Sequence, residues 1–415
     1  MDEFVIKDLT AEELPAYWKL ACIAFHSKSA GLEDEKTFLE NCTKGEEKAK
    51  ANPTAGGNYC TRAGLFRDGK LLSTLTAHAF EVNFDGNPCE FCGIGGVMSD
   101  PGARKTGGVS RVLSRELEKM HQRGQLLSHL YPFQTSFYRK FGYEHCAYAV
   151  EWTIPTQFLP QIPYDIRWYE NTPEEQETVR KLYETFAESH NLALRRSSAR
   201  WENQFRGLQP YSGKNFSYLH YGEDGPDGFL SYQPVEHDNA PLTIVVDRLY
   251  YAHPQALRKM LAFLGSQRPY ADEVKLRLPL GVDISAWLTE VCTAYDKRDV
   301  RRELLHLGAS RVVDVEGILK LARYCGRGSA DIRVVDPVCP WNDKCFHVVF
   351  DDRCQSVTET DRWDIRLTIG AFTALILGGR DLSEAAFMEG VEMGGNLENL
   401  RKIFYKKSMW IEDHF

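Results

Sequence analysis

Two Asp-Gly turns near the N-terminus constrain the fold of this chain more than any other feature of its sequence. The turns are Asp68-Gly69 and Asp85-Gly86-Asn87, and each lies between runs with a strand-like apolar pattern. Asp-Gly between such runs is the strongest short-range signal for a β-hairpin. The three runs that the turns separate are residues 62–67, 71–84 and 90–99. The sequence therefore predicts a twisted antiparallel meander.

The last strand of this meander continues directly into the loop 99–108 (SDPGARKTGG), and an amphipathic helix follows. Five apolar residues share one face of that helix, namely Val109, Val112, Leu113, Leu117 and Met120. Residues 26–57 are polar, charged and punctuated by glycine, and we expect them to form a helical, mobile cover. The other expected elements of this first unit are a strand at 4–6, a helix capped by Thr10, a strand at 126–131 and a short helix at 136–141.

A second unit follows Pro160 and repeats the element order of the first. Its expected elements are helices at 173–187 and 254–265 and strands at 218–221, 228–234, 243–251 and 273–278. No glycine turn precedes the helix at 254, so we interpret this unit as a copy of the first fold without a ligand loop.

A third unit begins near Val300 and is expected to be a small α+β domain. Its expected elements are strands at 312–315, 331–335, 345–350 and 365–369 and helices at 316–324, 369–378 and 382–392. The whole chain is therefore expected to be α+β (mixed α/β), with domains at 1–155, 156–298 and 299–415.

Length, charge and cysteine content narrow the class of protein. A chain of 415 residues is too long for one ordinary domain. The formal net charge of −8 argues against a general nucleic-acid binder and is compatible with cationic small-molecule ligands. The N-terminus lacks the pattern of a signal peptide, and the longest apolar stretch, 369–377, is too short to span a bilayer. Because eleven scattered cysteines do not indicate a disulfide framework, we expect a cytoplasmic protein with no membrane span.

The segment Arg104-Lys105-Thr106-Gly107-Gly108-Val109 has the features of a phosphate-binding helix start. Backbone N–H groups at a helix N-terminus, where the dipole is positive, bind phosphate, and glycine lets the phosphate approach the backbone. Two cationic side chains precede the glycines. The segment alone fits an ordinary strand-to-helix loop equally well, so both interpretations stay open on these residues.

The residues around this loop resemble the donor-binding motif of the GNAT superfamily of N-acetyltransferases. Gly96-Val97-Met98-Ser99-Asp100-Pro101 is followed by Arg104 and then by Gly107. The resemblance implies that the strand carrying Val97 to Ser99 splays from its neighbour, so that its free backbone groups pair with the pantetheine arm of acetyl-CoA. The cofactor-binding residues that it implies are Val97, Met98, Ser99, Arg104, Lys105, Thr106, Gly107, Gly108 and Val109. Val109 departs from the pattern, because the family often has Gly or Ala at that position.

A second group of residues resembles the Eis (enhanced intracellular survival) branch of these enzymes. The residues are Leu130-Tyr131-Pro132-Phe133 and then Phe137-Tyr138-Arg139-Lys140-Phe141-Gly142-Tyr143-Glu144. The resemblance implies an active N-terminal GNAT domain, a degenerate second GNAT-like domain and a C-terminal domain resembling sterol carrier proteins. It also implies a homo-oligomer, a hexamer in related proteins. The three units described above match this plan over essentially the whole chain.

The same resemblance implies two catalytic residues. Tyr138 matches the tyrosine that acts as general acid, since a phenol can protonate a departing CoA thiolate held beside it. Phe415 matches a C-terminal aromatic residue whose carboxylate lies in the site and can take a proton from the attacking ammonium. From the residues alone, a packing role for Tyr138 and a frayed terminus at Phe415 would be favoured. His414 is a further candidate base.

The sequence therefore predicts an N-acetyltransferase that uses acetyl-CoA as co-substrate and no metal. The expected acceptor is the primary amine of a small molecule or of a lysine-type group, and a direct attack on the thioester is expected. The alternative is a non-catalytic carrier of an apolar ligand that binds in the C-terminal domain. A longer acyl donor is a third possibility.

Two other patterns are interpreted as structural. Cys89 and Cys92 have the spacing of half a zinc site, but no second pair stands at a convincing distance, so two strand cysteines are expected. Ser189 and His190 could be a nucleophile and its base. Because adjacent residues on a helix or turn point apart, we expect a solvated surface pair instead.

Overall fold

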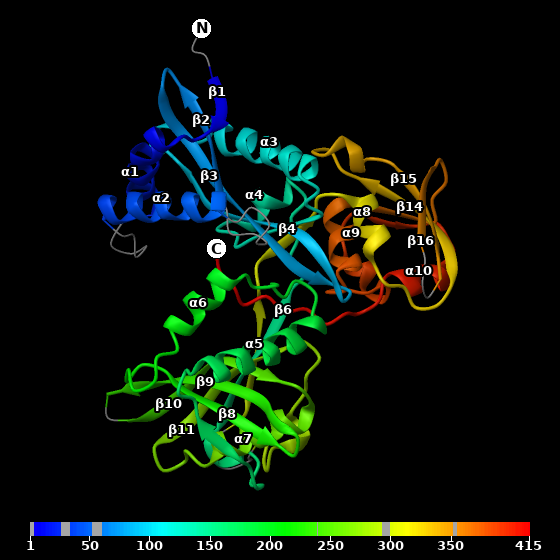
Figure 1. Cartoon of the computed structure of the whole chain (residues 1–415). Helices are drawn as coiled ribbons and strands as arrows, with labels where there is room; N and C mark the ends of the chain where they lie inside the picture. The colour runs from blue at the N-terminus through cyan, green and yellow to red at the C-terminus, as the bar shows by residue number, and fades with distance from the viewer. Residues whose placement is uncertain (1–3, 26–33, 52–59, 239, 293–298, 352–354) are drawn as a thin grey trace. The chain divides into compact units, whose positions relative to one another are not determined.

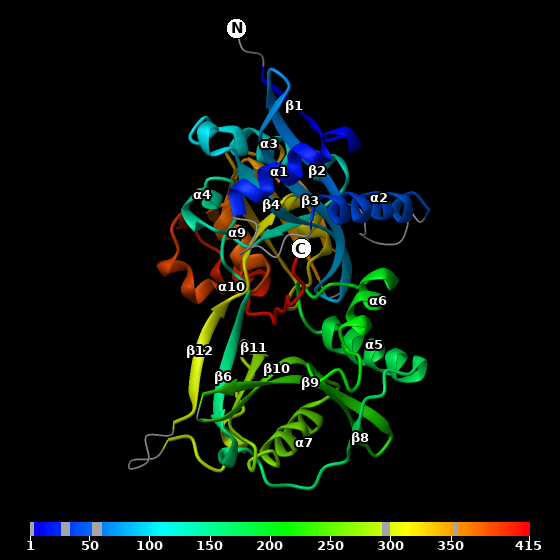
Figure 2. The same cartoon turned by 90° about the vertical axis from the view of Figure 1, so that its left-hand side faces the viewer.

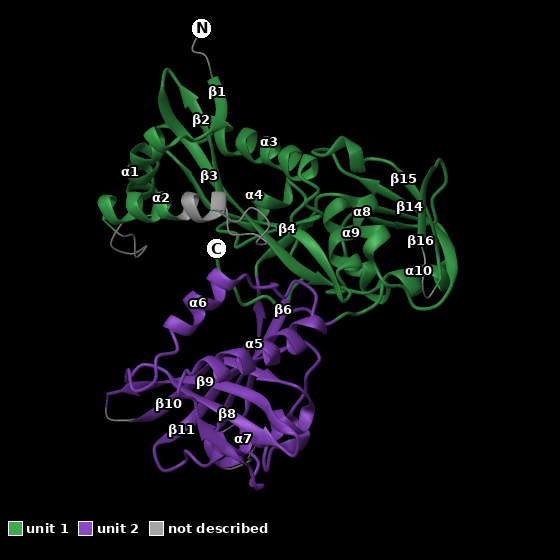
Figure 3. Ribbon diagram, in the orientation of Figure 1, with its two compact units in different colours: residues 1–147, 308–407, 411–415 green, residues 148–307, 408–410 purple. Residues whose placement is uncertain are grey.

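The structure is a computed structural model that describes residues 4–25, 34–51, 60–238, 240–292, 299–351 and 355–415. The chain divides into two compact units (Figure 3). Unit 1 contains residues 1–147, 308–407 and 411–415, and unit 2 contains residues 148–307 and 408–410. Both ends of the sequence therefore belong to unit 1. Of the predicted cover at 26–57, residues 35–51 form a helix, whereas 26–33 and 52–57 lie outside the described residues.

The first sheet of unit 1 has the strand order β1-β2-β3-β4-β5-β13 within the described residues. Its strands are β1 (Phe4–Asp8), β2 (Cys60–Arg67), β3 (Lys70–Phe84), β4 (Asn87–Ser99), β5 (Leu127–Leu130) and β13 (Ala309–Val312). Strands β1 to β4 are antiparallel, which confirms the predicted meander. Both Asp-Gly turns have the left-handed backbone that such turns need, with φ between 50° and 79° at Asp68, Gly69, Asp85 and Gly86. β5 then pairs parallel to β4, and β13 pairs antiparallel to β5.

Helices cover both faces of this sheet (Figures 1 and 2). The helices are α1 (Leu14–Phe25), α2 (Glu35–Ala51), α3 (Gly108–Gln122) and the short α4 (Thr135–Arg139). Four of the five residues predicted for the apolar face of α3 are fully buried, and Val109 is partly buried. They pack in a cluster that includes Leu65 of β2, whereas the next residue, Phe66, packs in a second cluster with α1. Consecutive strand residues point to opposite faces, so α1 and α3 cover opposite sides of the sheet.

Thr10 caps a helical turn, as predicted, although the turn is a 3-10 helix (Ala11–Glu13) that leads into α1. The Glu13 carboxylate accepts a hydrogen bond from the Thr10 backbone N–H at 2.8 Å, which completes a capping box.

The second sheet of unit 1 has the order β16-β15-β14-β17-β18 and comes from the C-terminal third of the chain. Its strands are β14 (Gly328–Val335), β15 (Cys345–Phe350), β16 (Gln355–Thr360), β17 (Ile365–Thr368) and β18 (Val391–Met393). Its helices are α8 (Val315–Leu321), α9 (Ile369–Ile376) and α10 (Leu397–Ile403).

Two predictions in this region are wrong. The helix predicted at 382–392 is a 3-10 helix (Leu382–Phe387) followed by β18. Gly390 has a φ of 72°, which ends any helical path, and β18 instead gains ladder hydrogen bonds to β17. The strand predicted at 312–315 ends at Val312, because the Asp314 carboxylate accepts from the Gly317 N–H at 2.9 Å and begins α8 at Val315.

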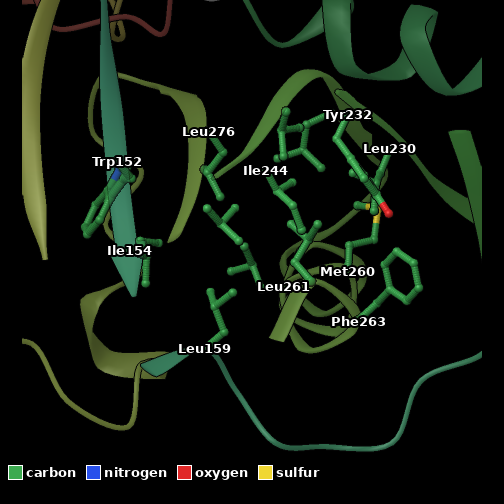
Figure 4. Packing of buried hydrophobic residues seen from close by; sticks show 14 of the residues in the cluster. Trp152, Ile154, Leu159, Leu230, Tyr232, Ile244, Met260, Leu261, Phe263 and Leu276 are labelled. Atoms are coloured by element: carbon green, nitrogen blue, oxygen red, sulfur yellow. The ribbon is translucent and has the colours of Figure 1, made fainter. Parts of the chain in front are cut away.

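Unit 2 contains a sheet of order β12-β6-β11-β10-β9-β8-β7. Its strands are β6 (Tyr148–Pro155), β7 (Ile166–Trp168), β8 (Phe216–Gly222), β9 (Gly225–His237), β10 (Ala240–Tyr251), β11 (Ala271–Pro279) and β12 (Arg301–His306). Its helices are α5 (Pro173–Glu188), α6 (Ser198–Arg206) and α7 (Pro254–Gly265). Figure 4 shows Met260, Leu261 and Phe263 of α7, Ile244 of β10 and Leu276 of β11, which belong to one buried cluster.

The tail returns to unit 2 for three residues before it ends in unit 1. The Asn191 N–H donates to the Ser408 carbonyl at 2.8 Å, and the Trp410 N–H donates to the Asn191 carbonyl at 3.0 Å. The Trp410 ring packs edge-on against Phe186 of α5 at 5.9 Å between centroids. Within the described residues, no helix is both long and apolar enough to cross a membrane.

Candidate active site

The strand β4 loses its β5 neighbour halfway along its length. Pairing with β5 runs from Phe91 to Ile94 and stops, although β4 itself continues to Ser99. On its other edge, β4 stays paired with β3, but the register shifts by one residue between Thr74 and Thr76. Gly96, with a φ of 55°, lies in this bulge. The splay predicted for the strand carrying Val97 to Ser99 is therefore present, and it leaves one backbone edge of β4 open beyond Ile94.

The loop after β4 is closed on itself by short-range hydrogen bonds. The Asp100 carboxylate accepts from the Gly102 N–H at 2.8 Å and contacts the Lys70 ammonium at 2.6 Å, and the Lys70 hydrogen bond lowers the pKa of Asp100. The Thr106 hydroxyl donates to the Ala103 carbonyl at 2.8 Å. Lys105 and Gly107 both have left-handed backbone, with φ of 66° and 77°. These bonds and dihedrals fix the path by which the loop enters α3.

The first turn of α3 has no side-chain cap. Gly107 is the N-cap residue, and the first backbone bond of the helix runs from the Arg111 N–H to the Gly107 carbonyl at 3.1 Å. The amides of Gly108, Val109 and Ser110 are therefore left to point out of the helix end, where the dipole is positive. A Cβ at Gly108 would lie 2.3 Å from the Ser73 hydroxyl oxygen, so only glycine lets the helix start this close to β3.

These residues fit an acyl-CoA. An open strand edge, a left-handed glycine turn and an uncapped helix start follow one another in the chain, and the side chains of Arg104 and Lys105 are exposed beside them. Free backbone amides at a helix N-terminus bind phosphate, and Arg and Lys side chains add charge to such a site. All nine residues predicted to bind the co-substrate thus lie on one continuous strand, loop and helix start.

The corresponding helix start in unit 2, that of α7, is capped by a side chain. The ring nitrogen Nδ1 of His253 accepts from the Ala256 N–H at 3.3 Å and caps α7. The other ring nitrogen of His253 lies 3.0 Å from an oxygen of Asp227. A histidine cap and a nearby carboxylate disfavour a bound phosphate, which agrees with the interpretation of this unit as a copy without a ligand loop.

Tyr138 lies on α4 and is only 2% exposed. Its ring packs edge-on against Phe133, Phe137 and Tyr143 at 5.5, 5.1 and 6.2 Å between centroids. Burial raises the pKa of Tyr138 above its ordinary value, so the phenol keeps its proton at neutral pH. Tyr143, interpreted from sequence as a packing residue, is 1% exposed and shares a 2.8 Å hydrogen bond with the Ser128 hydroxyl.

The C-terminal tail is docked in unit 1, so the frayed terminus favoured by the residues alone is not what the structure shows. The Tyr131 hydroxyl donates to the Asp413 carbonyl at 3.2 Å, and the His414 ring lies 4.7 Å from the Tyr131 ring. The Phe415 ring is surrounded by five rings of β3, β4, β5 and the residue after β5. The five are His78, Phe80, Phe91, His129 and Tyr131, with centroid distances between 5.4 and 6.2 Å.

Two glycines of β4 make room for Phe415. A Cβ at Gly93 would lie 2.5 Å from two ring carbons of Phe415, and a Cβ at Gly95 would lie 3.0 Å from the Phe415 carbonyl oxygen. Glycine inside a strand often marks a close approach by another group, so Gly93 and Gly95 carried a signal that the sequence interpretation missed. The five surrounding rings carried none, because aromatic residues in strands are ordinary core residues.

Tyr138 and Phe415 do not touch each other by a ring contact. Tyr138 packs on Tyr143, whose hydroxyl bonds to Ser128 of β5, whereas Phe415 packs on His129, the next residue of β5. Because consecutive strand residues point to opposite faces, the two predicted catalytic residues approach β5 from opposite sides of the sheet.

Cys89 and Cys92 lie in β4 and are buried, as expected for strand cysteines. Burial raises the pKa of both thiols far above the ordinary value, so neither forms a thiolate at neutral pH. Among the described residues, no group of three or more His, Cys, Asp or Glu side chains is placed to hold a metal ion.

The prediction of a solvated surface pair is wrong for His190 and holds for Ser189, which is exposed. His190 is 7% exposed, its ring stacks on Phe186 at 4.2 Å, and its Nδ1 lies 2.6 Å from the Phe186 carbonyl and 2.9 Å from the Ser189 hydroxyl. A carbonyl only accepts, so Nδ1 carries a hydrogen and cannot take the proton of Ser189. The pair is thus a helix end with an exposed serine and a buried histidine, and not a nucleophile with its base.

Comparison with protein families gives three matches along the chain. An acetyltransferase (GNAT) domain model matches residues 5–146, a second acetyltransferase (GNAT) domain model matches residues 192–302, and a sterol carrier protein domain model matches residues 315–412. No curated protein matches the sequence closely enough to count as a relative.

Three solved structures share the fold over the full length of both chains. A probable N-acyltransferase from Enterococcus faecalis, described as a conserved protein of unknown function, has a TM-score of 0.80 at 21% identity. A GCN5-related N-acetyltransferase from Anabaena variabilis has a TM-score of 0.80 at 18% identity. Eis1 from Mycobacterium abscessus has a TM-score of 0.77 at 20% identity. Each covers 100% of this chain and is itself covered completely.

The two domain models match the splayed strand and helix start of unit 1 and the related sheet of unit 2, and the third matches the C-terminal sheet. The chain therefore belongs to the GNAT acetyltransferases and has the Eis-like arrangement of two acetyltransferase domains followed by a sterol carrier protein domain.

Proposed function

We propose that this protein transfers an acetyl group from acetyl-CoA to a primary amine in its first acetyltransferase domain. The observation that carries the proposal is the continuous path from the open edge of β4 to the uncapped start of α3. Acetyl-CoA, when bound there, supplies the acetyl thioester and the leaving thiolate. The open strand edge at 95–99 would hold the pantetheine arm, and the α3 amides with Arg104 and Lys105 would hold the phosphates.

Tyr138 is the proposed general acid. Its phenol keeps its proton because burial raises its pKa, so it is ready to donate when a thiolate departs beside it. The rings of Phe133, Phe137 and Tyr143 hold the side chain in one orientation and exclude water. A buried thiolate is itself a stronger base than one in water, which favours this proton transfer.

The carboxylate of Phe415 is the proposed general base. An α-carboxylate is ionised at neutral pH and can take a proton from an attacking ammonium, directly or through one water. The five rings around Phe415 and the bond from Tyr131 to Asp413 hold the tail, and a carboxylate oxygen of Phe415 lies over Gly95 where β4 separates from β5. These contacts support a base at the splay, where the thioester would lie in this proposal.

The proposed acceptor is a cationic amine, either on a small molecule of the polyamine or aminoglycoside type or on a lysine-type group. The tail that ends in the proposed site carries Glu412 and Asp413, and the whole chain has a net charge of −8. A screen of amines with acetyl-CoA, read by release of CoA, identifies the class, and a panel of acyl-CoAs tests for a longer acyl donor. By its resemblance to Eis proteins, the chain is also expected to form a hexamer, which light scattering measures.

Two variants test the mechanism. Tyr138→Phe and a chain that lacks Phe415 should each lower kcat by a factor of about 10²–10⁴, the usual contribution of a general acid or base. Acetyl-CoA binding, measured by calorimetry, should change little. His414→Ala is the matched comparison for the tail, since it tests the other candidate base. Unchanged turnover in both of the first two variants would contradict the mechanism, and a loss only in His414→Ala would move the base to that ring.

The carrier alternative would need an apolar site, and unit 1 has a cavity of about 700 Å³ beside the start of α9. Its lining includes Phe387 and Met388, but also Arg139, Lys140 and Glu389. Arg139 already pairs with Glu144 at 2.8 Å, but an apolar ligand would remove Lys140 and Glu389 from water and supply no partner for them, so the cavity does not favour such a ligand. Lipid that co-purifies with a chain showing no stabilisation by CoA would instead favour the carrier.

A further inference from the structure

Lys407 is a buried lysine that lies eight residues before the end of the chain. Its ammonium lies 2.7 Å from an Asp85 carboxylate oxygen, and both side chains are 6% exposed. It also donates to the Ile376 carbonyl at 3.1 Å and lies 5.3 and 4.8 Å from the ring centroids of Phe84 and Tyr405. A carboxylate, a carbonyl and two aromatic faces thus fix the position of this one charged group.

The backbone around this ion pair is fixed as well. The Lys407 N–H donates to the Gly378 carbonyl at 3.1 Å, and Gly378 has a φ of 84°. A Cβ at Gly378 would lie 2.4 Å from the Lys407 Cβ, so the two segments approach each other more closely than any residue but glycine would permit. On the other side, Asp85 lies in the β3–β4 turn and also accepts from the Arg323 N–H at 2.8 Å. Neither partner of the pair can move without disturbing backbone hydrogen bonds.

The β3–β4 hairpin therefore holds the tail at two places. Asp85 at its turn holds Lys407, and Gly93 and Gly95 on β4 receive Phe415. The eight steps from Lys407 to Phe415 reach at most about 29 Å. Within the hairpin, the six steps of β4 from Asn87 to Gly93 cover about 20 Å at the usual rise of a strand, and the turn adds the two steps from Asp85 to Asn87. Between these two points the tail is held again, because Ser408 and Trp410 share backbone hydrogen bonds with Asn191, so it has little slack.

We propose that Asp85 and Lys407 are positioning residues that set where the tail begins and so place the Phe415 carboxylate over Gly95. This inference rests on the proposed function, in which that carboxylate is the base. A buried ion pair adds little net stability compared with apolar residues of similar size, whereas it defines a geometry sharply. The role of the pair is thus to orient the tail.

The experiment compares Lys407→Met, the double variant Asp85→Asn with Lys407→Met, and Lys406→Met. The double variant leaves no unpaired charge behind, which separates orientation from the cost of a lone buried carboxylate. Lys406→Met is the matched control, because its ammonium contacts Glu384 and the Gly379 carbonyl and does not touch the hairpin. Each variant is also made in a chain that lacks Phe415.

In the full chain, Lys407→Met and the double variant should lower kcat by a factor of about 10 to 100, as expected when a catalytic group is displaced by about 1 Å. KM for acetyl-CoA should stay within a factor of about 2, since the donor loop is untouched. The loss should shrink as pH rises toward the pKa of the acceptor amine, because a neutral amine needs no base. Lys406→Met should behave as the unaltered chain does.

The chain without Phe415 separates the possible outcomes. If the pair acts through Phe415, the Lys407 variants should cause no further loss there, since effects on one catalytic unit are not additive. The inference would be overturned if the Lys407 variants lowered kcat by a further factor in the chain without Phe415. It would also be overturned by an unchanged kcat in the full chain or by a loss of kcat that does not depend on pH. If removal of Phe415 leaves kcat unchanged, the proposed function fails instead. The rate at which carboxypeptidase A releases Phe415 then decides the positioning role, with a faster release expected in both Lys407 variants and an unchanged rate contradicting it.

Discussion

Gly93 leaves space that the ring of Phe415 occupies. A Cβ there would lie 2.5 Å from two carbons of the Phe415 ring, which five other rings confine. Gly93→Ala should therefore displace the tail and lower kcat by a factor of about 10 to 100 while KM for acetyl-CoA stays nearly constant. Steady-state kinetics measures both. Gly395→Ala is the control, because nothing lies within 4 Å of its added Cβ, and an equal loss in that variant would contradict the explanation.

His190 predicts a pH dependence of stability. Burial lowers its pKa in the folded chain below the ordinary value of about 6.5, which the unfolded chain keeps. Below pH 6.5 the unfolded state binds a proton that the folded state does not, so this contribution to stability is present above that pH and is lost as pH falls.

The free energy of unfolding should therefore fall more steeply between pH 7 and 5 in the unaltered chain than in His190→Gln. The difference can reach about 1.4 kcal/mol per pH unit for one group. Urea unfolding at several pH values measures it, and parallel curves for the two proteins would contradict the explanation.

The sequence predicts the role of a residue when the role depends on its neighbours in sequence. It does not predict a role that depends on contacts with distant parts of the chain. The turn Lys105 to Gly108 could be predicted because its glycines and cations are adjacent in sequence. The buried state of His190 could not, since it depends on where the end of α5 meets the rest of unit 2. The second role of Asp85 could not be predicted either. Its sequence context indicates a hairpin turn residue, but its carboxylate also binds Lys407, 322 residues away.

At the scale of elements, the contact between α3 and β3 determines the geometry of the donor site. Gly108→Ala would bring a Cβ to 2.3 Å from the Ser73 hydroxyl oxygen and 3.0 Å from the Ser73 Cβ, so the helix start must move away from the strand. Acetyl-CoA affinity should fall by a factor of about 10 or more, because a shifted helix start misplaces several phosphate-binding amides at once. Calorimetric titration with CoA measures the change.

Gly370→Ala in α9 is the comparison for this prediction. The Cβ there would meet other atoms only at 3.6 Å or more, which is ordinary contact, so CoA affinity should be unchanged. Equal affinity in both variants would mean that the start of α3 does not bind the phosphates.

Helices and strands with a strong turn signal or a clear apolar periodicity are predicted correctly from sequence. Elements that form only because they pair with an adjacent strand are not. The meander and α3 follow from Asp-Gly turns and a helical repeat of apolar residues. β12 was missed because its sequence, RRELLH, is polar and mostly exposed, and it becomes a strand only by pairing with β6 (Figure 2). The helix expected at 382–392 begins after a capping box at Asp381, but it ends at Phe387, and the chain then pairs with β17 as β18.

At the scale of the whole chain, unit 1 is assembled from both ends of the sequence. β13 extends the sheet of the first acetyltransferase domain beyond β5, and Glu144 and Ser310 exchange two backbone hydrogen bonds of 2.9 Å. The fully buried Arg311 guanidinium bonds to the Phe141 carbonyl and to Asp336 at 2.5 Å, which ties α4 to the C-terminal sheet. The residues of the donor site thus lie in the first third of the chain, but residues from the last third pack around them.

This dependence makes a specific prediction about the end of the chain. A short Gly-Ser extension after Phe415 converts the terminal carboxylate into a neutral peptide group at the place where it would act as base. The extended chain should lose a factor of about 10²–10⁴ in kcat, as after removal of a general base, with little change in acetyl-CoA affinity. The same extension before Met1 should have no effect, because β1, the first described strand, lies at the edge of the sheet and is separated from β4 by β2 and β3.

The thermal transition of the extended chain distinguishes a chemical loss from a structural one. If the Phe415 ring stays among its five neighbours, the melting temperature should shift little while turnover is lost, since the ring and not the carboxylate makes the packing contacts. Removal of the extension by a protease that leaves Phe415 as the last residue should restore turnover. A fully active extended chain would show that a carboxylate at Phe415 is not needed, and the base would then have to be sought among His414 and the other titratable groups near the splay of β4.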